Sequence, residues 1–283
     1  MECKAVERSA DWIDREYGTE KWPMVLGLIR EQRAEGETDL ARVLAKVMRK
    51  WRKRSVWQAG ESVLAGHTLE MPYGLAWEAK QGMIVEGVLE ACRPDTTRII
   101  ELGSGWGFNL MQAWTRGGPR SARYIAAEYT QAGRDCAAAL AELAPEMEFE
   151  AHALDYHRIE DCTIAPAQGH TLVFTAQSIE QIPHLSAEVL RFIGQLGDHV
   201  TCVHFEPVGW QLTADDKDAQ RASRDSYSKA NDYNQNLWAL LQEAEANSEL
   251  RVQRVVRDLV GPNPKNPVTL FEWNTDQDEH PLE

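Results

Sequence analysis

The sequence has no long apolar run and no export signal. No stretch approaches the roughly twenty consecutive apolar residues that a membrane-spanning helix needs. The opening segment, MECKAVERSADWIDREYG, lacks the apolar core of a signal peptide. These two absences predict a cytoplasmic protein that has no membrane partner.

Basic charge and paired cysteines are also scarce. The chain has 30 Lys and Arg against 44 Asp and Glu, a formal net charge of −14, which argues against a nucleic-acid partner. The cysteines are odd in number, scattered and without CxxC spacing: Cys3, Cys92, Cys136, Cys162 and Cys202. We expect reduced thiols, which excludes a disulfide framework and a cysteine-based zinc site.

The segment before Pro94 is expected to be helical. Apolar residues recur there at three- and four-residue spacing, as on one face of a helix: Leu40, Val43, Leu44, Val47, Met48 and Trp51. Several tryptophans also lie in this first third, some expected in the core and some in an aromatic lid: Trp12, Trp22, Trp51, Trp57 and Trp77. We predict that residues 1–93 form an N-terminal helical extension or lid.

From residue 94 onward, short apolar strands alternate with helices. The expected strands span 98–102, 123–128, 147–153, 171–175, 199–205, 251–258 and 267–273. Strands separated by helices indicate crossover connections and a parallel sheet buried on both faces. Only the short turn GPNPKN joins the last two strands, which predicts an antiparallel hairpin. The fold class is therefore α/β, a doubly wound, mainly parallel seven-stranded sheet over 94–275, with a tail at 276–283.

The stretch RIIELGSGWGFNL, residues 98–110, places three glycines directly after the first of these strands. Glycine costs backbone entropy, so its use at Gly103, Gly105 and Gly107 favours a tight turn that lets a ligand approach the backbone. In doubly wound sheets ligands bind at the carboxyl ends of the strands. A dinucleotide site has GxGxxG with a small final residue, but here that position is Phe108 and the spacing is GxGxG.

This turn, with Glu101 two residues before its first glycine, resembles motif I of the class I S-adenosylmethionine-dependent methyltransferases. The strand pattern with its terminal hairpin is similar to the fold of that family. The resemblance implies S-adenosylmethionine as the cofactor. It places Glu101 near the amino acid head, Glu128 at the ribose hydroxyls and Asp155 at the adenine amino group. Tyr156, or its neighbour His157, would cover the ring.

The ends of the fourth and fifth strands supply the candidate catalytic residues. FTAQSIEQIP matches the family's motif IV in position and offers Gln177 and Glu180 beside the transferred methyl, although Glu180 also suits a helix N-terminus. VHFEPVGW offers His204 and Glu206. A hydroxyl acceptor needs a general base, which a histidine or a desolvated carboxylate can supply. An amine acceptor needs only deprotonation by bulk water and a carboxylate that holds it.

A metal site is the weaker alternative. Asp155, Glu180, Glu206 and Asp215 have oxygen ligands suited to a divalent ion, but they form no compact ligand motif. We expect no metal.

Two segments are expected to close the substrate pocket. One is GHTLEMPYGLAW, which contains Tyr73, and the other is the insert 207–236 after the fifth strand. Tyr227, Asn231 and Tyr233 of that insert are hydrogen-bonding groups suited to a polar small molecule, although a polar loop would have the same composition.

The favoured function is methyl transfer from S-adenosylmethionine to a polar small molecule. SIEQIP and FEP are similar to bacterial methyltransferases that act on sugars or natural products, which favours a hydroxyl acceptor. An amine, amino acid or peptide acceptor is one alternative. An NAD-dependent oxidoreductase or a non-catalytic Rossmann-like binding protein is another. The sequence leaves a homodimer open.

Overall fold

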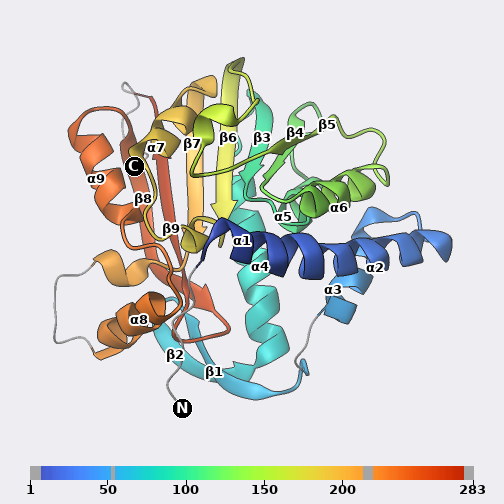
Figure 1. Ribbon diagram of the computed structural model, residues 1–283, viewed down its shortest axis with the longest axis horizontal. Coiled ribbons are helices and arrows are strands. Elements are labelled where there is room, and N and C mark those ends of the chain that lie inside the picture. The colour runs from blue at the N-terminus through green and yellow to red at the C-terminus, as the bar shows by residue number, and fades with distance from the viewer. Residues whose placement is uncertain (1–7, 52–54, 213–218, 277–283) are drawn as a thin grey trace.

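The computed structural model describes residues 8–51, 55–212 and 219–276, which form one layered α/β unit (Figure 1). A single nine-stranded sheet has the strand order β2-β1-β8-β9-β7-β6-β3-β4-β5. Its strands are β1 Ala59–Leu64, β2 His67–Pro72, β3 Thr96–Leu102, β4 Arg123–Glu128, β5 Phe149–Ala153, β6 Ala167–Ala176, β7 Gly197–Glu206, β8 Arg251–Gly261 and β9 Val268–Asn274.

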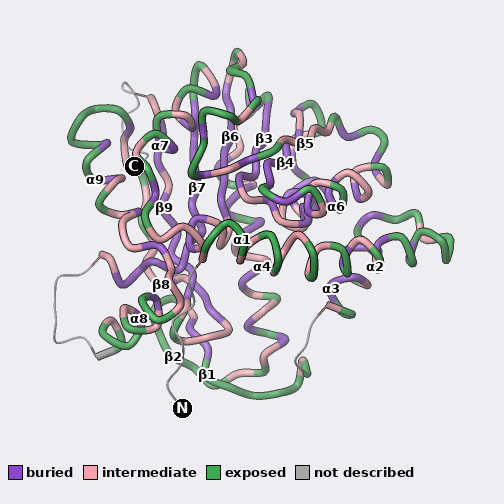
Figure 2. Tube along the Cα trace, in the orientation of Figure 1, coloured by how far each residue is buried: buried purple, intermediate pink, exposed green. Residues whose placement is uncertain are grey.

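The centre of the sheet is parallel, from β5 through β4, β3 and β6 to β7. Strand β9 runs antiparallel to both of its neighbours, β7 and β8. All seven expected strands are present, and the mainly parallel sheet with a terminal antiparallel hairpin is confirmed. The central strands are buried, as Figure 2 shows, because helices cover both faces.

The sheet has two strands more than the seven expected. Strands β1 and β2 form a hairpin, which joins the edge of β8 through the pairs Val63↔Gly261 and Leu64↔Val260. The expectation of a wholly helical N-terminal segment was therefore wrong at 59–72. Ala65 and Gly66 both have positive φ, 48° and 79°, as a two-residue hairpin turn requires. This Ala-Gly pair was the local signal for the hairpin.

Helices cover each face of the sheet. They are α1 Ala10–Ile13, the π-helix η1 Asp14–Lys21, α2 Trp22–Ala34, α3 Leu40–Trp51, α4 Tyr73–Glu90, α5 Phe108–Thr115, α6 Gln131–Ala141, α7 Ala187–Gly194, α8 Ala219–Ala230 and α9 Leu237–Ala246. Short 3₁₀ turns are η2 Ile159–Asp161, η3 Ile179–Gln181 and η4 Gly209–Leu212. The expected amphipathic helix is α3, and its apolar face is buried. Among the described helices, none combines the length and the apolar character that crossing a bilayer would require.

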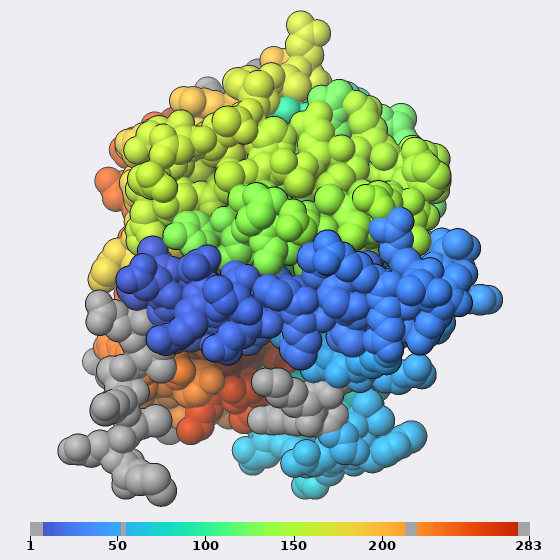
Figure 3. Space-filling view, turned by 45° about the vertical axis from the view of Figure 1, so that its right-hand side comes forward, coloured from blue at the N-terminus to red at the C-terminus, as the bar shows by residue number. Residues whose placement is uncertain are grey.

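Two apolar clusters lie on the two faces. One packs α2 to α6 against side chains such as Ile99, Ala126 and Phe174. The other packs α7 and α9 against side chains such as Cys202 and Trp273. Because helices from both sides of Pro94 share the first cluster, the N-terminal segment is part of the main core. Figure 3 shows this segment as a continuous band across one face.

Candidate active site

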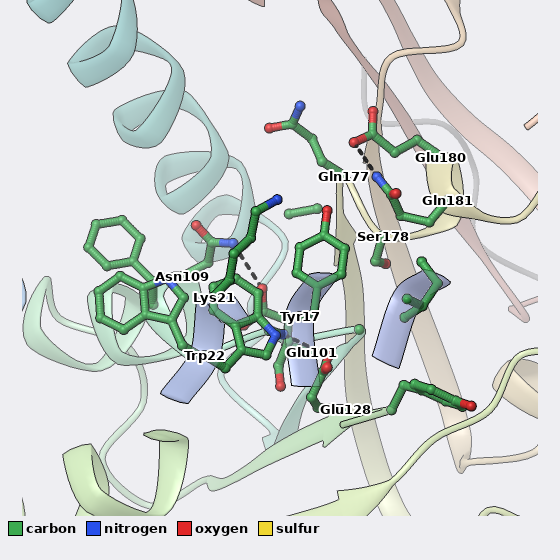
Figure 4. A pocket seen from close by; sticks show the side chains of 18 of the residues that line it. Tyr17, Lys21, Trp22, Glu101, Asn109, Glu128, Gln177, Ser178, Glu180 and Gln181 are labelled. Carbon is green, nitrogen blue, oxygen red and sulfur yellow. Dashed lines mark hydrogen bonds between the residues drawn. The ribbon is translucent and has the colours of Figure 1, made fainter. Parts of the chain in front are cut away.

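A cavity of about 380 Å³ lies at the carboxyl ends of β3, β4 and β6. The glycine turn, the loops after β4 and β5 and the turn after β6 form one side. Residues of α1, η1 and α2 to α4 form the other. In Figure 4, Tyr17, Lys21 and Trp22 face Glu101 and Glu128, while Gln177, Ser178 and Glu180 lie together near the turn after β6.

The three glycines of the glycine turn all adopt left-handed backbone conformations. The φ angles of Gly103, Gly105 and Gly107 are 69°, 55° and 82°. A Cβ at Gly103 would lie 2.3 Å from the Ser178 Cβ, and one at Gly105 would lie 3.0 Å from the Trp22 ring. Gly103 and Gly105 line the cavity. Gly107 instead lies against α6, where a Cβ would come within 2.9 Å of the Ala137 Cβ.

Glu101 lies at the end of β3 and is 1% exposed. Its Oε1 accepts a hydrogen bond from Asn109 Nδ2 at 2.9 Å, and its Oε2 accepts from the Leu110 N–H at 3.1 Å. Burial raises the pKa of Glu101 to about 8, although both hydrogen bonds favour the ionised form. The cavity therefore has an acid in its wall, as the resemblance implies.

Glu128, at the end of β4, reaches back to the glycine turn. Its Oε2 accepts from the Gly105 N–H at 3.0 Å, and its Oε1 accepts from the N–H and Oγ1 of Thr130 at 3.1 and 2.9 Å. Burial raises the pKa of Glu128. Within the described residues the Gly105 N–H is the one hydrogen-bond donor to Oε2, so that oxygen retains acceptor capacity toward the cavity.

The loop after β5 places Asp155 and Tyr156 at the cavity. Asp155 accepts from the His157 N–H at 2.9 Å and from Arg158 Nε at 3.2 Å. The Tyr156 hydroxyl is 3.0 Å from Ser178 Oγ, so this side chain joins the loop to the turn after β6. Tyr129, which is 36% exposed, also lines this end of the cavity. The sequence reasoning did not name it as a site residue.

The turn after β6 presents Gln177 and Glu180 to the cavity. Gln177 has a φ of 56°, a left-handed conformation that is uncommon outside glycine and concentrates at functional sites. Glu180 is 6% exposed and accepts from Gln181 Nε2 at 2.8 Å and Asn266 Nδ2 at 3.3 Å. Burial raises the pKa of Glu180, which moves this carboxyl toward the range of a general base.

Glu206 does not face the cavity, contrary to the expectation. Its carboxylate is fully buried and accepts from the backbone N–H groups of Ser178, Ile179 and Glu180 at 3.2, 3.2 and 3.0 Å. Burial raises its pKa to about 8, while these hydrogen bonds favour the ionised form. Glu206 positions the turn that carries Glu180, and we no longer assign it contact with an acceptor.

His204 lies inside the sheet core, so it is poorly placed to be the base. It is fully buried; Trp273 Nε1 donates to its Nε2 at 2.9 Å, and its Nδ1 is 3.0 Å from Thr175 Oγ1. Burial lowers the pKa of His204 to about 3. Among the described residues that line the cavity, His204 does not occur.

The expected substrate residues lie around the cavity without lining it. Tyr73 packs beside Trp77, with ring centroids 6.1 Å apart, and Trp77 lines the cavity. Tyr233 contacts the Arg8 guanidinium, 4.4 Å from its ring centroid, and Arg8 lines the cavity. The other two, Tyr227 and Asn231, belong to the same side: Tyr227 packs edge-on against Tyr233, and the Asn231 carbonyl accepts from Arg8 Nε at 2.7 Å.

The aromatic wall of the N-terminal segment was foreseen only in outline. Trp12, Tyr17 and Trp22 recur every fifth residue, and their ring centroids are 6.1 and 5.3 Å apart. Five is the hydrogen-bonding step of a π-helix, and η1 covers this region. The five-residue spacing was the available signal, and Tyr17 and Trp22 line the cavity.

Lys80 of α4 is a charged residue of the cavity that the sequence reasoning missed. It is 5% exposed and lines the cavity, and its Nζ donates a hydrogen bond to Gln177 Oε1. Burial lowers the pKa of Lys80 to about 8, and Glu180 opposes that change. The spacing of Trp77, Lys80 and Gln81 on one helix face was the signal.

No group of three or more metal-ligating side chains occurs within the described ranges. Asp215 lies outside the described residues.

Comparison with known proteins gives matches of fold alone. No family model matches the chain, and no curated protein does. The seven expected strands occur in the sheet in the order β5-β4-β3-β6-β7-β9-β8, with β9 antiparallel to its neighbours. This strand order matches the α/β topology that the resemblance to class I methyltransferases implies.

Similar solved structures include a SAM-dependent methyltransferase from Aquifex aeolicus, with 11% identity, a TM-score of 0.44 and coverage of 73% of this chain and 100% of that one. Magnesium protoporphyrin IX methyltransferase from Synechocystis, with bound SAH, has 9% identity, a TM-score of 0.46 and coverage of 71% and 84%.

Proposed function

We propose that this protein is an S-adenosylmethionine-dependent methyltransferase that acts on a polar small molecule, with a sugar or natural-product hydroxyl as the favoured acceptor. One observation carries the proposal. The left-handed glycine turn is hydrogen-bonded through the Gly105 N–H to Glu128, and both line a cavity at the carboxyl ends of parallel strands.

The lining of the cavity fits this cofactor better than a dinucleotide. Glu101 and Glu128 are both buried in the wall, where their carboxyls would oppose a pyrophosphate and suit ribose hydroxyls and an ammonium. The rings of Tyr17 and Trp22 offer faces to a sulfonium. Ser104 Oγ and Trp22 Nε1 are buried without a partner among the described residues, so two polar groups of the wall are free for a ligand.

We assign each group of cavity residues a role in the reaction. The bound cofactor would supply an electrophilic methyl group on its sulfonium. Glu180 is the acid that faces the acceptor side, and we assign it the proton of an acceptor hydroxyl, which it takes as the oxygen attacks. Glu206 holds the backbone of this turn through three hydrogen bonds. The aromatic wall excludes water and aligns the reactants.

An amine acceptor is the second candidate. The observation that favours it is that Glu180 is buried in the same cavity, where a carboxylate would hold an ammonium group. An amine is already nucleophilic once deprotonated, so loss of the Glu180 charge would weaken acceptor binding more than the chemical step.

We further propose that residues 1–93 cover the cofactor and that the insert 207–236 borders the acceptor. Trp22 lies over Gly105, and Arg8 connects the N-terminal segment to the insert through its hydrogen bond to the Asn231 carbonyl. Residues 94–275 form the catalytic unit in this proposal.

Calorimetry on the full chain tests the cofactor. We expect micromolar binding of S-adenosylmethionine and of S-adenosylhomocysteine and no binding of NAD. Glu128→Gln should weaken binding of S-adenosylhomocysteine by roughly tenfold to a hundredfold, because a charge-assisted hydrogen bond is lost. Glu142→Gln, at an exposed ion pair with Arg33, is the matched control. Binding of NAD without binding of S-adenosylmethionine would overturn the proposal.

A further inference from the structure

A second set of polar groups lies on the cavity wall opposite the glycine turn. Trp77, Lys80 and Gln81 occupy positions i, i+3 and i+4 of α4, so they share one face of that helix. All three line the cavity (Figure 1 shows α4 alongside the sheet).

The Lys80 ammonium has fewer partners than its burial requires. The side chain is 5% exposed, yet within the described residues Nζ has one hydrogen-bond acceptor, Gln177 Oε1. Its other contact is the ring of Trp77, with Nζ 4.4 Å from the centroid. An ammonium has three N–H donors, so two remain for another group. A buried charge is costly unless it is paired. No ion pair joins Lys80 to a described carboxylate, although the charge of Glu180 acts on it, so a ligand can supply a directly paired counter-charge.

Two more donors accompany the ammonium. Trp77 Nε1 is buried and has no hydrogen-bond partner among the described residues. The Gln177 amide accepts the Lys80 hydrogen bond through Oε1. Its Nε2 group, the other end of the same amide, carries two N–H donors. Gln177 has a left-handed backbone and lines the cavity. A ligand with several acceptor oxygens and a negative charge satisfies such a set.

The position of Lys80 assigns the ligand to the acceptor side. Its ammonium is hydrogen-bonded to Gln177, which lies in the turn after β6 together with Glu180. The charge of Glu180 raises the pKa of Lys80. Glu101, which the resemblance places near the amino acid head of the cofactor, is at the end of β3 and is hydrogen-bonded to α5.

We propose that Lys80, together with the Trp77 indole and the Gln177 amide, binds a carboxylate of the acceptor. The substrate class is therefore a small acceptor acid, with its carboxylate at Lys80 and its methylated group near Glu180. The inference rests on the proposed function, because it requires an acceptor beside the cofactor.

A matched pair of probes tests the charge directly. The full chain is saturated with S-adenosylhomocysteine and titrated by calorimetry with sodium benzoate and, separately, with the neutral benzamide. We expect the wild type to bind benzoate at least about tenfold more tightly than benzamide. Lys80→Met should bind both alike, since methionine keeps an unbranched side chain of comparable length and removes the charge.

Lys21→Met is the matched control, because Lys21 also lines the cavity but pairs with Glu16 and is partly exposed. It should keep the preference for benzoate. Thermal melting checks that Lys80→Met is folded, and loss of a buried charge should not lower its melting temperature.

The outcomes separate the inference from the function beneath it. A wild type that does not bind S-adenosylhomocysteine overturns the proposed function. A wild type that binds it but does not prefer benzoate, or a Lys80→Met variant that keeps the preference, overturns the acceptor-carboxylate inference alone. So does a Lys80→Met variant that loses affinity for S-adenosylhomocysteine, because the carboxylate would then be the cofactor's own.

Discussion

The ends of β4 and β7 each present a buried glutamate, and only one of them faces the cavity. Glu128 ends β4 and reaches the glycine turn through the Gly105 N–H. Glu206 ends β7 and is enclosed by the backbone N–H groups of the turn after β6. The two sites are similar in sequence, since each acid is the last residue of a buried strand.

The difference follows from the alternation of side chains along a strand. Two residues before Glu128, Ala126 belongs to the apolar cluster under α2 to α6. Four residues before Glu206, Cys202 belongs to the cluster under α7 and α9. Because side chains two or four positions apart point to the same face, the two acids point to opposite faces of the sheet. The cavity opens on the face of Ala126.

The largest expected effect concerns the acid that the turn brings to the cavity. Glu180→Gln should lower turnover by roughly 10²–10⁴-fold with a hydroxyl acceptor, the usual contribution of a general base. Affinity for S-adenosylhomocysteine should hardly change, because Glu180 faces the acceptor side. The rate of S-adenosylhomocysteine formation and calorimetry measure the two quantities.

Glu188→Gln is the control for that variant, since Glu188 lies in an exposed pair with Arg191 on α7. Full turnover in Glu180→Gln would leave proximity as the mechanism and remove the base from the proposal.

The same substitution at Glu206 and at Glu128 tests whether the two acids have different roles. Glu206→Gln should keep the affinity for S-adenosylhomocysteine within a few-fold, whereas Glu128→Gln should not. Glu206→Gln should instead lower the free energy of unfolding by about 1–3 kcal/mol. In the variant the amide NH₂ group would face a backbone N–H that in the wild type donates to the carboxylate, and that N–H would lose its acceptor. Urea unfolding measures this loss. Equal loss of cofactor affinity in both variants would contradict the assignment of the two acids to different faces.

His204 should affect stability in acid and leave cofactor binding unchanged. Burial lowers its folded-state pKa to about 3, below the ordinary value of about 6.5, so the neutral ring stabilises the fold above pH 6.5. This contribution is lost as pH falls from 6.5 toward 3, because the unfolded chain binds a proton that the folded chain does not. Between pH 7 and pH 5 the loss amounts to about 2 kcal/mol.

His204→Asn supplies the comparison for that measurement, because asparagine does not titrate in this range. The difference in unfolding free energy between wild type and variant should change with pH by the stated amount. A difference that is constant between pH 7 and pH 5 would mean that His204 is protonated or solvated in the folded protein.

The smallest expected effect comes from a pair of glycine substitutions, which separates the cost of backbone strain from the contact with Trp22. Gly105→Ala should cost about 1–2 kcal/mol of stability for a left-handed residue, and its Cβ would press on Trp22. Gly36→Ala has positive φ with no neighbour within 4 Å of the new Cβ. Both should melt earlier, but only Gly105→Ala should weaken S-adenosylhomocysteine binding. Equal affinities would show that the contact with Trp22 does not shape the site.

Much of the strand-end side of the cavity was predictable from the sequence. Two glycines of the turn, both acids beneath it, and the polar residues after β5 and β6 all line the cavity: Glu101, Gly103, Gly105, Glu128, Asp155, Tyr156, Gln177 and Glu180. Each of them follows a strand or a turn with a strong local pattern. Lys80 and Tyr17 were missed because their helices reach the cavity through packing of segments distant in the chain.

The sequence by itself determined the alternation of strands and helices, the left-handed glycine turn and the terminal hairpin, because each depends on residues that are neighbours in the chain. Tertiary structure decided which face of the sheet holds the cavity. Strands buried on both faces are apolar on both of them along most of their length, so their hydrophobic pattern does not tell the two faces apart. Only packing of the N-terminal helices against the face of Ala126 brought Lys80 and the aromatic wall to the cavity that Glu128 lines, and left His204 and Glu206 on the other side.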